Sequence, residues 1–479
     1  NTRYPSRLLD VGQCDEDKVK LFNTKDFISS DSQNFDYIAL SYHWGVSAAF
    51  RTTKSSQADR ECGFSHEFMP RTLRETVQAT RDLGFRYLWI DALCILQAEG
   101  PDDEVAAADW KKESVRMNEV YGGAALTIVA AGSSDCDGGL FRGRPTSREL
   151  NDWHSSEGVI PFHDEPLASR AWTFQEWILS KRLLVFSTSR QGMHFVCTKF
   201  PMPTSNHIYQ FNLPESAKDC TYSDWATAVV LFSRRNLTNP ADKLPAISGV
   251  AKRYAEITGK AASDYLAGLW RDSLPRDLLW SNTFSEFKFA PIPYREGRPP
   301  IMINPETGKE LPLRTPSWSW AAIDGFIDYN ALKYTPITDS LVISCDVTPG
   351  LNQDRFGQIH SETLVMRCWY VLASFPASSA DNINKWDQRL SCVSGCADSK
   401  GFGLLPGDFQ EVGLMKTETP KPVLYCLLIA ELDEFGGHAN AAGIVVRFDE
   451  KKNHFYRVGL FEADQSEFDH SEEREFEIH

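Results

Sequence analysis

The chain has 479 residues, which is too long for one ordinary hydrophobic core and predicts two domains. Its formal net charge of −15 argues against nucleic acid or an anionic membrane as the main partner, because both require a concentrated basic surface. No run approaches the roughly 18 consecutive apolar residues of a membrane-spanning helix.

The cysteines indicate a reducing compartment. Eleven are scattered along the chain, and several, such as Cys94 and Cys368, lie inside apolar runs, which is typical of reduced thiols rather than of a disulfide framework. Cys392 and Cys396 form a lone CxxxC with no second pair, so no metal site is expected there. Because no signal peptide is visible either, we expect a cytoplasmic protein.

The N-terminal part predicts strands and one helix. Residues 1–35 form an expected N-terminal extension, with a strand at about 7–11 that adds to an edge of the sheet. The run DYIALSYHWG predicts an apolar strand that ends in a polar and aromatic turn. A polar loop over 46–68 then leads to a helix with Pro70 near its start and Gly84 just past its end. Its inner stripe consists of Leu73, Val77, Thr80 and Leu83.

The stretch 87–131 organises the domain. The apolar strand RYLWI stops at Asp91 and is expected to be buried on both faces. A helix over about 103–121 follows, and LTIVAAG predicts the next strand. Two β-α-β units with right-handed crossovers imply a parallel sheet covered by helices on both faces, which is an α/β fold.

The segment RAWTFQEWILSKRLLVFS predicts a short helix and a strand at 182–186, and closes a first domain that we place at 36–187. We expect structural roles for Arg170, Trp172, Gln175 and Glu176, with Arg170 and Glu176 forming an internal ion pair.

Residues 188–479 have a different pattern. Helices at about 223–232 and 243–258 precede many short strands separated by Pro, Gly and Asn, which predicts an α+β region with antiparallel sheets. Its role is open.

Polar and aromatic residues are expected to meet beyond the carboxyl ends of the parallel strands, where such sheets bind ligands. The predicted binding residues are Ser41, Tyr42, His43, Trp44, Asp91, Cys94, Gln97 and Trp110. The alternatives are that Ser41 and Asp91 cap turns, that His43 is a hydrogen-bonded turn residue, and that Cys94 and the tryptophans are core residues.

Glu113 is the most informative residue, because it falls on the apolar stripe of its predicted helix. A carboxylate on the buried side is costly unless it is paired or lines a cavity. Either Glu113 is a structural acid paired with an arginine such as Arg170 or with backbone donors, or it lies in the crevice. In the crevice it could hold sugar hydroxyls and stabilise an oxocarbenium-like transition state. Motifs for phosphoryl transfer, zinc proteolysis and α/β-hydrolase chemistry are absent.

Four motifs resemble the heterokaryon incompatibility (HET) domain of filamentous fungi over residues 36–186. They are YIALSYHWG, MPRTLRETVQATRDLGFRYLWIDALCILQ, DWKKESVRMNEVYGGA and RAWTFQEWILS. Later segments, including RTPSWSWAAIDG, resemble the C-terminal region of many HET proteins. The resemblance implies a role in non-self recognition and regulated cell death when incompatible hyphae fuse.

The HET family is also thought to be distantly similar to Toll/interleukin-1 receptor (TIR) domains, which have a flavodoxin-like parallel sheet and several of which cleave NAD+ at the nicotinamide–ribose bond. The catalytic Glu of that family follows a Trp by three residues, as Glu113 follows Trp110, although Lys111 stands where the TIR pattern has Cys. The resemblance therefore implies that Glu113 is catalytic and that NAD+ is a substrate, with no metal or other cofactor.

Two other functions stay open. The chain could be a non-catalytic signalling and self-assembly module that acts as a homo-oligomer or with a partner protein. It could also be an enzyme on another small metabolite in the same crevice.

Overall fold

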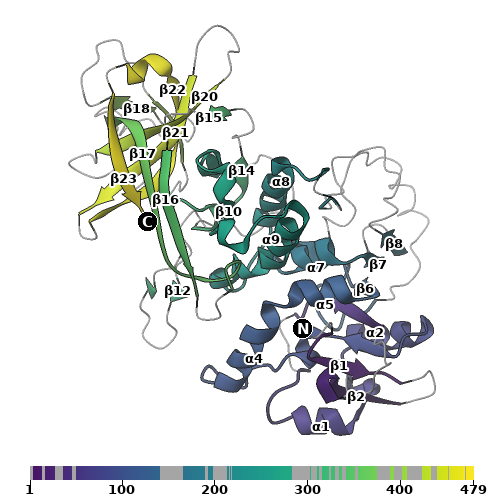
Figure 1. The fold of residues 1–479 in the computed structure, drawn as a ribbon. Helices are drawn as coiled ribbons and strands as arrows, with labels where there is room; N and C mark the ends of the chain where they lie inside the picture. Colours follow the sequence, from purple (N-terminus) through teal and green to yellow (C-terminus); the bar gives the residue numbers. More distant parts are fainter. Residues whose placement is uncertain are drawn as a thin grey trace, which may run out of the picture. The chain divides into compact units, whose positions relative to one another are not determined.

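A computed structural model describes most of the chain. The described residues are 4–12, 17–26, 36–45, 50–140, 165–188, 192–197, 213–214, 216, 218–282, 302–303, 310–311, 315–322, 325–329, 334–336, 341–350, 354–374, 389–392, 402–406, 423–432, 440–450, 453–469 and 471–479. They divide into two compact units (Figure 1). Unit 1 comprises residues 1–215, 235–237 and 245–254, and unit 2 comprises 216–234, 238–244 and 255–479.

Unit 1 is built on an eight-stranded sheet with the order β4-β2-β1-β5-β3-β6-β7-β8. Its strands are β1 (Arg7–Asp10), β2 (Lys18–Asn23), β3 (Tyr37–Ser41), β4 (Phe64–Ser65), β5 (Tyr87–Trp89), β6 (Leu126–Val129), β7 (Arg182–Ser187) and β8 (Gly192–Cys197). The strands β5, β3, β6 and β7 pair in parallel, and in their register Ile38 lies opposite both Leu88 and Leu126. The flanking strands pair antiparallel.

The order of the parallel strands fixes where a ligand would bind. Numbered along the chain, they lie in the order second, first, third, fourth, which is how a flavodoxin-like doubly wound sheet begins. The direction of the connections reverses after β5, so the topological switch point lies between β3 and β6. The predicted parallel-sheet α/β class of this unit is confirmed.

The helices of unit 1 connect these strands. They are α1 (Gln57–Cys62), α2 (Arg71–Asp82), α3 (Asp91–Cys94), α4 (Glu104–Ser114), α5 (Met117–Gly123) and α7 (Thr173–Leu179). Helix α2 begins after Pro70 and ends before Gly84, whose φ of 80° suits a residue without Cβ. Helices α5 and α7 pack against each other. Leu83 is 44% exposed, so its place on the predicted inner stripe is wrong, because the helix has already ended at Asp82.

Three further expectations need correction. Strand β1 lies between β2 and β5 rather than at an edge. The loop predicted over 46–68 contains α1 and β4 within its described residues. The helix predicted over 103–121 is two helices, α4 and α5, because Arg116 leaves helical geometry, with φ −105° and ψ 6°. The Val115 carbonyl freed at this break accepts a hydrogen bond from Lys252 Nζ at 2.8 Å.

Unit 2 contains helix α8 (Tyr222–Ser233), the last turn of α9 (Pro245–Thr258) and a nine-stranded sheet. The sheet includes β15 (Tyr334–Pro336), β16 (Leu341–Pro349), β17 (Ile359–Ser374), β18 (Arg389–Cys392), β19 (Phe402–Pro406), β20 (Leu424–Leu432), β21 (Asn440–Asp449), β22 (His454–Asp464) and β23 (Glu472–Ile478). All of these pairings except β22–β23 are antiparallel, as predicted (Figure 1). Outside this sheet, unit 2 buries five tryptophans, which are Trp225, Trp270, Trp280, Trp318 and Trp320.

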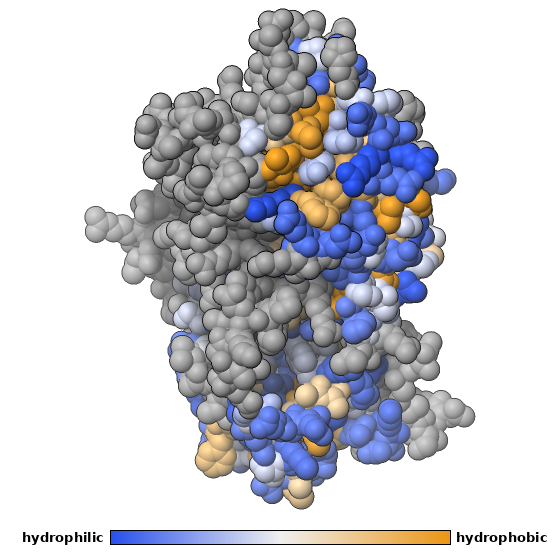
Figure 2. Space-filling view, turned by 90° about the vertical axis from the view of Figure 1, so that its left-hand side faces the viewer, coloured by the Kyte–Doolittle hydropathy of each residue, from blue (hydrophilic) through white to orange (hydrophobic). Residues whose placement is uncertain are grey.

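Membrane-spanning helices and metal-binding clusters are both absent from the described residues. Among the described helices, none has both the length and the apolarity needed to cross a bilayer. Within the same part of the chain, no three His, Cys, Asp or Glu side chains are grouped to hold a metal ion. Cys396 of the CxxxC lies outside the described residues. On the face shown in Figure 2, hydrophilic residues predominate, and hydrophobic residues lie in groups between them.

Candidate functional site

A cluster of polar and charged side chains lies at the carboxyl end of the central parallel strands. Ser41 is the last residue of β3, and Asp91 follows β5 directly as the first residue of α3. Glu176 reaches the cluster from α7, and Tyr121 reaches it from α5. Residues far apart in sequence therefore meet beside the switch point of the sheet, where doubly wound folds bind ligands.

Asp91 is held by two neutral donors. Its Oδ2 accepts a hydrogen bond from Trp44 Nε1 at 2.8 Å, and its Oδ1 accepts one from the Ala92 amide at 2.7 Å. Burial raises the pKa of Asp91 to about 6, and the charge of Arg170 together with these hydrogen bonds limits that rise. The carboxyl group can therefore exchange a proton close to neutral pH.

Glu176 has an even higher proton affinity. Burial raises its pKa to about 7, although the polar Ser41 hydroxyl favours the ionised form. The negative charge of Asp91 raises the pKa further, whereas the charge of Arg170 and the polar Tyr121 hydroxyl, which donates to the Leu40 carbonyl at 3.2 Å, lower it. The two acids influence each other, so they titrate as a pair rather than independently.

Two arginines compensate this pair from a distance. Arg170 Nη1 donates to the Tyr42 carbonyl at 3.1 Å, and its charge lowers the pKa of both acids. Arg235 Nη1 donates to Thr173 Oγ1 at 3.0 Å, and burial lowers its pKa to about 10. The predicted direct Arg170–Glu176 ion pair is wrong, because among the described residues no cation lies within 4.0 Å of the Glu176 carboxylate, and Arg170 acts through longer-range charge.

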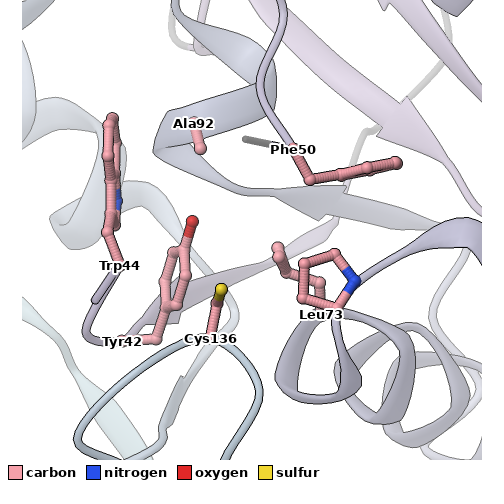
Figure 3. A pocket seen from close by; sticks show the side chains of 7 residues that line it. Tyr42, Trp44, Phe50, Leu73, Ala92 and Cys136 are labelled. Carbon is pink, nitrogen blue, oxygen red and sulfur yellow. The ribbon is translucent and has the colours of Figure 1, made fainter. Parts of the chain in front are cut away.

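An aromatic pocket adjoins Asp91 (Figure 3). It is lined by Tyr42, Trp44, Phe50, Pro70, Leu73, Ala92 and Cys136. Figure 3 shows Tyr42 between Trp44 and Cys136, with its hydroxyl directed toward Ala92. The cavity volume is about 10 Å³, which is room for about one water molecule. A larger ligand would enter this pocket only if the lining side chains moved apart. Because Trp44 and Ala92 also hold Asp91, the acid and the pocket form one site.

Other predicted binding residues lie around this site in different roles. His43 Nδ1 accepts a hydrogen bond from the Gly45 amide at 2.9 Å, and burial and the Arg170 charge lower the His43 pKa. Gln97 Nε2 donates to the carbonyls of Ile95 and Asp91, which braces the turn after α3. Cys94 is in the core, where burial raises its pKa to about 12, so it is not a ready nucleophile.

The remaining predicted residues pack against their neighbours. The rings of Trp110 and Trp172 meet edge to face at 5.5 Å, and neither residue lines the aromatic pocket. Gln175 is fully buried, and its Oε1 accepts a hydrogen bond from the Gly249 amide of α9 at 3.2 Å. These contacts join α4 and α9 to the region of α7.

Glu113 is buried, as its helical position predicts, with only 3% of its surface exposed. It does not lie among the residues of the pocket. Its Oε1 accepts hydrogen bonds from Ser6 Oγ at 2.6 Å and Lys112 Nζ at 2.7 Å, and Arg116 Nη1 lies 3.9 Å from Oε2. Burial alone would raise the pKa of Glu113, but these hydrogen bonds and charges outweigh it and leave the pKa below its usual value. The catalytic role of Glu113 stays a prediction, and its contacts favour the structural alternative.

Sequence reasoning missed part of the site. Arg235 lies some 60 residues beyond Glu176 in sequence, and no pattern links it to the crevice. Tyr121 is buried at the end of the predicted helix, and sequence reasoning did not anticipate that its hydroxyl donates a hydrogen bond to the Leu40 carbonyl of β3 at 3.2 Å. Phe50 and Cys136 line the pocket although each falls in an irregular segment.

Comparison with protein families identifies the unit that carries this site. The sequence model of the family described as Heterokaryon incompatibility protein (HET) matches residues 37–176, a stretch that starts with β3 and includes Ser41, Asp91 and Glu176. No curated protein and no solved structure gives a match to the chain. The chain therefore contains a heterokaryon incompatibility domain at residues 37–176.

Proposed function

We propose that this protein acts in heterokaryon incompatibility by cleaving NAD+ at the bond between nicotinamide and ribose. The HET domain ties the chain to heterokaryon incompatibility itself. The observation that carries the proposed chemistry is a pair of proton-exchanging acids, Asp91 and Glu176, beside an aromatic pocket at the switch point of a parallel sheet.

The reaction has chemical requirements that this site can meet. The C1′–N bond breaks, its electron pair stays on the ring nitrogen, and nicotinamide leaves as a neutral molecule. The ribosyl carbon becomes cationic, and a nearby carboxylate stabilises that charge. A water oxygen then bonds to C1′, and its proton passes to a carboxylate. The leaving group needs no protonation, so neither a metal ion nor a further cofactor is required.

The aromatic pocket is the proposed site for the nicotinamide ring, which would enter once the lining side chains move apart. Its aromatic lining offers flat surfaces to a flat ring, and a positively charged pyridinium is attracted to the faces of Tyr42 and Trp44. Asp91 accepts hydrogen bonds from Trp44 and Ala92, so its negative charge lies next to two residues of the pocket wall. The remaining nucleotide would extend out of the pocket. A reducing cytoplasm is the location that we propose, since eight of the described cysteines are free thiols.

Assembly without catalysis is the second candidate. Strand β8 is at the end of the eight-stranded sheet, and among the described strands it pairs only with β7. It exposes Met193 and Phe195, with 63% and 55% of their surfaces accessible. An apolar edge strand is a template for pairing with another chain, which supports a role for homo-oligomers or a signalling partner.

The test is incubation of the purified full-length chain with NAD+ and measurement of free nicotinamide and ADP-ribose. We expect both products in equal amounts, and Asp91→Asn should reduce their rate of formation. If the chain releases no nicotinamide at concentrations where it self-associates, NAD+ cleavage is refuted. Toxicity on expression that survives Asp91→Asn but is lost on Phe195→Lys would instead support the assembly function.

A further inference from the structure

We infer that the aromatic pocket is gated: the Phe50 ring closes it, and the Arg60 guanidinium holds that ring in the closed position. The pocket opens when the Phe50 side chain turns out of the wall, and a flat aromatic ring such as nicotinamide then enters. The identity of that ligand rests on the proposed function, whereas the gate itself does not.

The closed state of the pocket is the first argument. Its cavity has room for about one water molecule, so a wall must move before any larger group enters. Tyr42 is only 5% exposed, and no described residue forms a hydrogen bond with its hydroxyl. Buried hydroxyl groups normally have a partner. The Tyr42 hydroxyl is therefore available to a polar atom of a molecule that enters the pocket.

Phe50 is the part of the wall with the weakest attachment. Four of the other lining residues belong to the buried hydrophobic core, and these are Tyr42, Leu73, Ala92 and Cys136. Trp44 is fixed by its hydrogen bond to Asp91 at 2.8 Å, and the ring of Pro70 restricts the backbone directly before α2. Phe50 is partly exposed, and its side chain has no polar atom that could fix it. In Figure 3 it lies on the opposite side of the pocket from Trp44.

The backbone beside Phe50 stays in place when the gate opens. The Thr52 amide donates a hydrogen bond to the Ala92 carbonyl at 2.9 Å, and the Gln97 amide donates one to the Thr52 carbonyl at 2.8 Å. These two bonds attach the chain to α3 and to the turn that follows it. Opening is therefore a rotation of the Phe50 side chain rather than a displacement of the segment.

Arg60 of α1 holds the ring through its charge. Its Cζ lies 4.1 Å from the centroid of the Phe50 ring and 4.4 Å from that of Phe64, and the two rings are 5.9 Å apart. Within the described residues Arg60 forms no ion pair, and its Nε has no hydrogen-bond partner. The aromatic faces are thus its main attachment. Such contacts are weak compared with the burial of a core side chain, so the ring can leave at a small cost.

The experiment measures how fast iodoacetamide alkylates Cys136, because the sulfur of this residue lies inside the pocket (Figure 3). All chains carry Cys62→Ser, which removes an exposed thiol from α1. Relative to this parent chain, we expect the rate at Cys136 to rise about 3- to 10-fold in Arg60→Met and further in Phe50→Ala. Mass spectrometry of the Cys136 peptide measures the rate.

Two controls separate the gate from general loosening. Arg86→Met also removes an arginine from an aromatic ring, that of Tyr87, but neither residue lines the pocket, so the rate at Cys136 should stay unchanged. Cys94 is 1% exposed in the core and reports unfolding. Equal rates at Cys136 in the parent, Arg60→Met and Phe50→Ala would overturn the inference. A parallel rise at Cys94 would overturn it as well, because the opening would then be unfolding.

The ligand is tested separately with free nicotinamide. Increasing concentrations should slow the alkylation of Cys136 in Arg60→Met, because the bound ring covers the thiol. If nicotinamide gives no protection, the assignment of the ligand is wrong. A chain that releases no nicotinamide from NAD+ would refute the proposed function, and the ranking of the alkylation rates would still decide whether the gate exists.

Discussion

Glu113 and Glu176 are both acids withdrawn from solvent within unit 1, yet their surroundings have opposite effects. Glu113 is surrounded by the donors Ser6, Lys112 and Arg116, which lower its pKa. Glu176 is surrounded by hydroxyl groups and by the charge of Asp91, and its pKa rises to about 7. Burial therefore does not identify a reactive acid, because the groups that contact it decide whether the charge is neutralised or kept available.

The largest effect should come from removing the first acid. Glu113→Ala removes a buried acceptor shared by Ser6, Lys112 and Arg116, although the two cations keep other partners. We expect the free energy of unfolding at pH 7 to fall by about 3 kcal/mol. Half of the Lys112 side chain is exposed to solvent, so this decrease in the free energy of unfolding should be at the lower limit for breaking a buried ion pair. Urea unfolding monitored by circular dichroism measures this change in the free energy of unfolding. A change below about 0.5 kcal/mol would mean that these contacts do not stabilise the fold.

The second acid should respond in the opposite direction. The folded state raises the pKa of Glu176 from 4.5 to about 7, so it binds the proton more tightly than the unfolded state does, and stability falls as pH rises through this window. A neutral amide avoids that loss. Glu176→Gln should therefore be more stable relative to wild type at pH 8 than at pH 4 by roughly 2–3 kcal/mol. Thermal or urea unfolding at the two pH values measures the difference, and a pH-independent effect would refute it.

The same measurement separates the two acids further. The pKa of Glu113 is lowered on folding, so its contribution to stability is present above its usual pKa and is lost as pH falls below that value. Relative to Glu113→Gln, the wild type should lose stability between pH 6 and pH 3, which is the reverse of the slope for Glu176.

A smaller effect is expected where α9 contacts the break between α4 and α5. Lys252→Met removes the hydrogen bond from Lys252 Nζ to the Val115 carbonyl while keeping the apolar length of the side chain. We expect a loss of about 1 kcal/mol in the free energy of unfolding, with no change in the titration of Glu176. Urea unfolding together with carboxyl titration checks both parts.

The smallest effect concerns Asp91. Trp44→Phe keeps an aromatic ring at the pocket but removes the hydrogen bond to Asp91 Oδ2, which favours the ionised form. The pKa of Asp91 should therefore rise above about 6, by less than one unit. Carboxyl resonances recorded between pH 4 and pH 9 report this shift, and an unchanged or lowered pKa would contradict it.

Much of the sheet could be predicted from local patterns. The apolar runs around Ile38 and Leu88 predict strands buried on both faces, and Pro70 with Gly84 delimits α2. The break at Arg116 could not be predicted from helical periodicity, because it coincides with hydrogen bonds from Arg116 to Tyr4 and Ser6, which are distant in sequence.

The site was predicted only in part. Ser41, Tyr42, Trp44 and Asp91 follow from the rule that ligands bind at the carboxyl ends of parallel strands, and the structure brings them together. The helical pattern also predicts that Glu113 is buried, but it says nothing about which cations contact it. Glu176 lies on a helix of seven residues, which is too short for periodicity to indicate its partners.

The interleaving of the two units has a practical consequence for dissecting the protein. Asn236 binds the backbone of Ser169 and Ala171, and Lys252 binds that of Val115, although the matched family stretch ends at residue 176. A polypeptide cut at residue 187 would lack both of these supports as well as Arg235. Truncation experiments on the HET domain should therefore retain the chain through residue 254. If a shorter piece is inactive, the loss of these stabilising contacts explains the result without the loss of any catalytic residue.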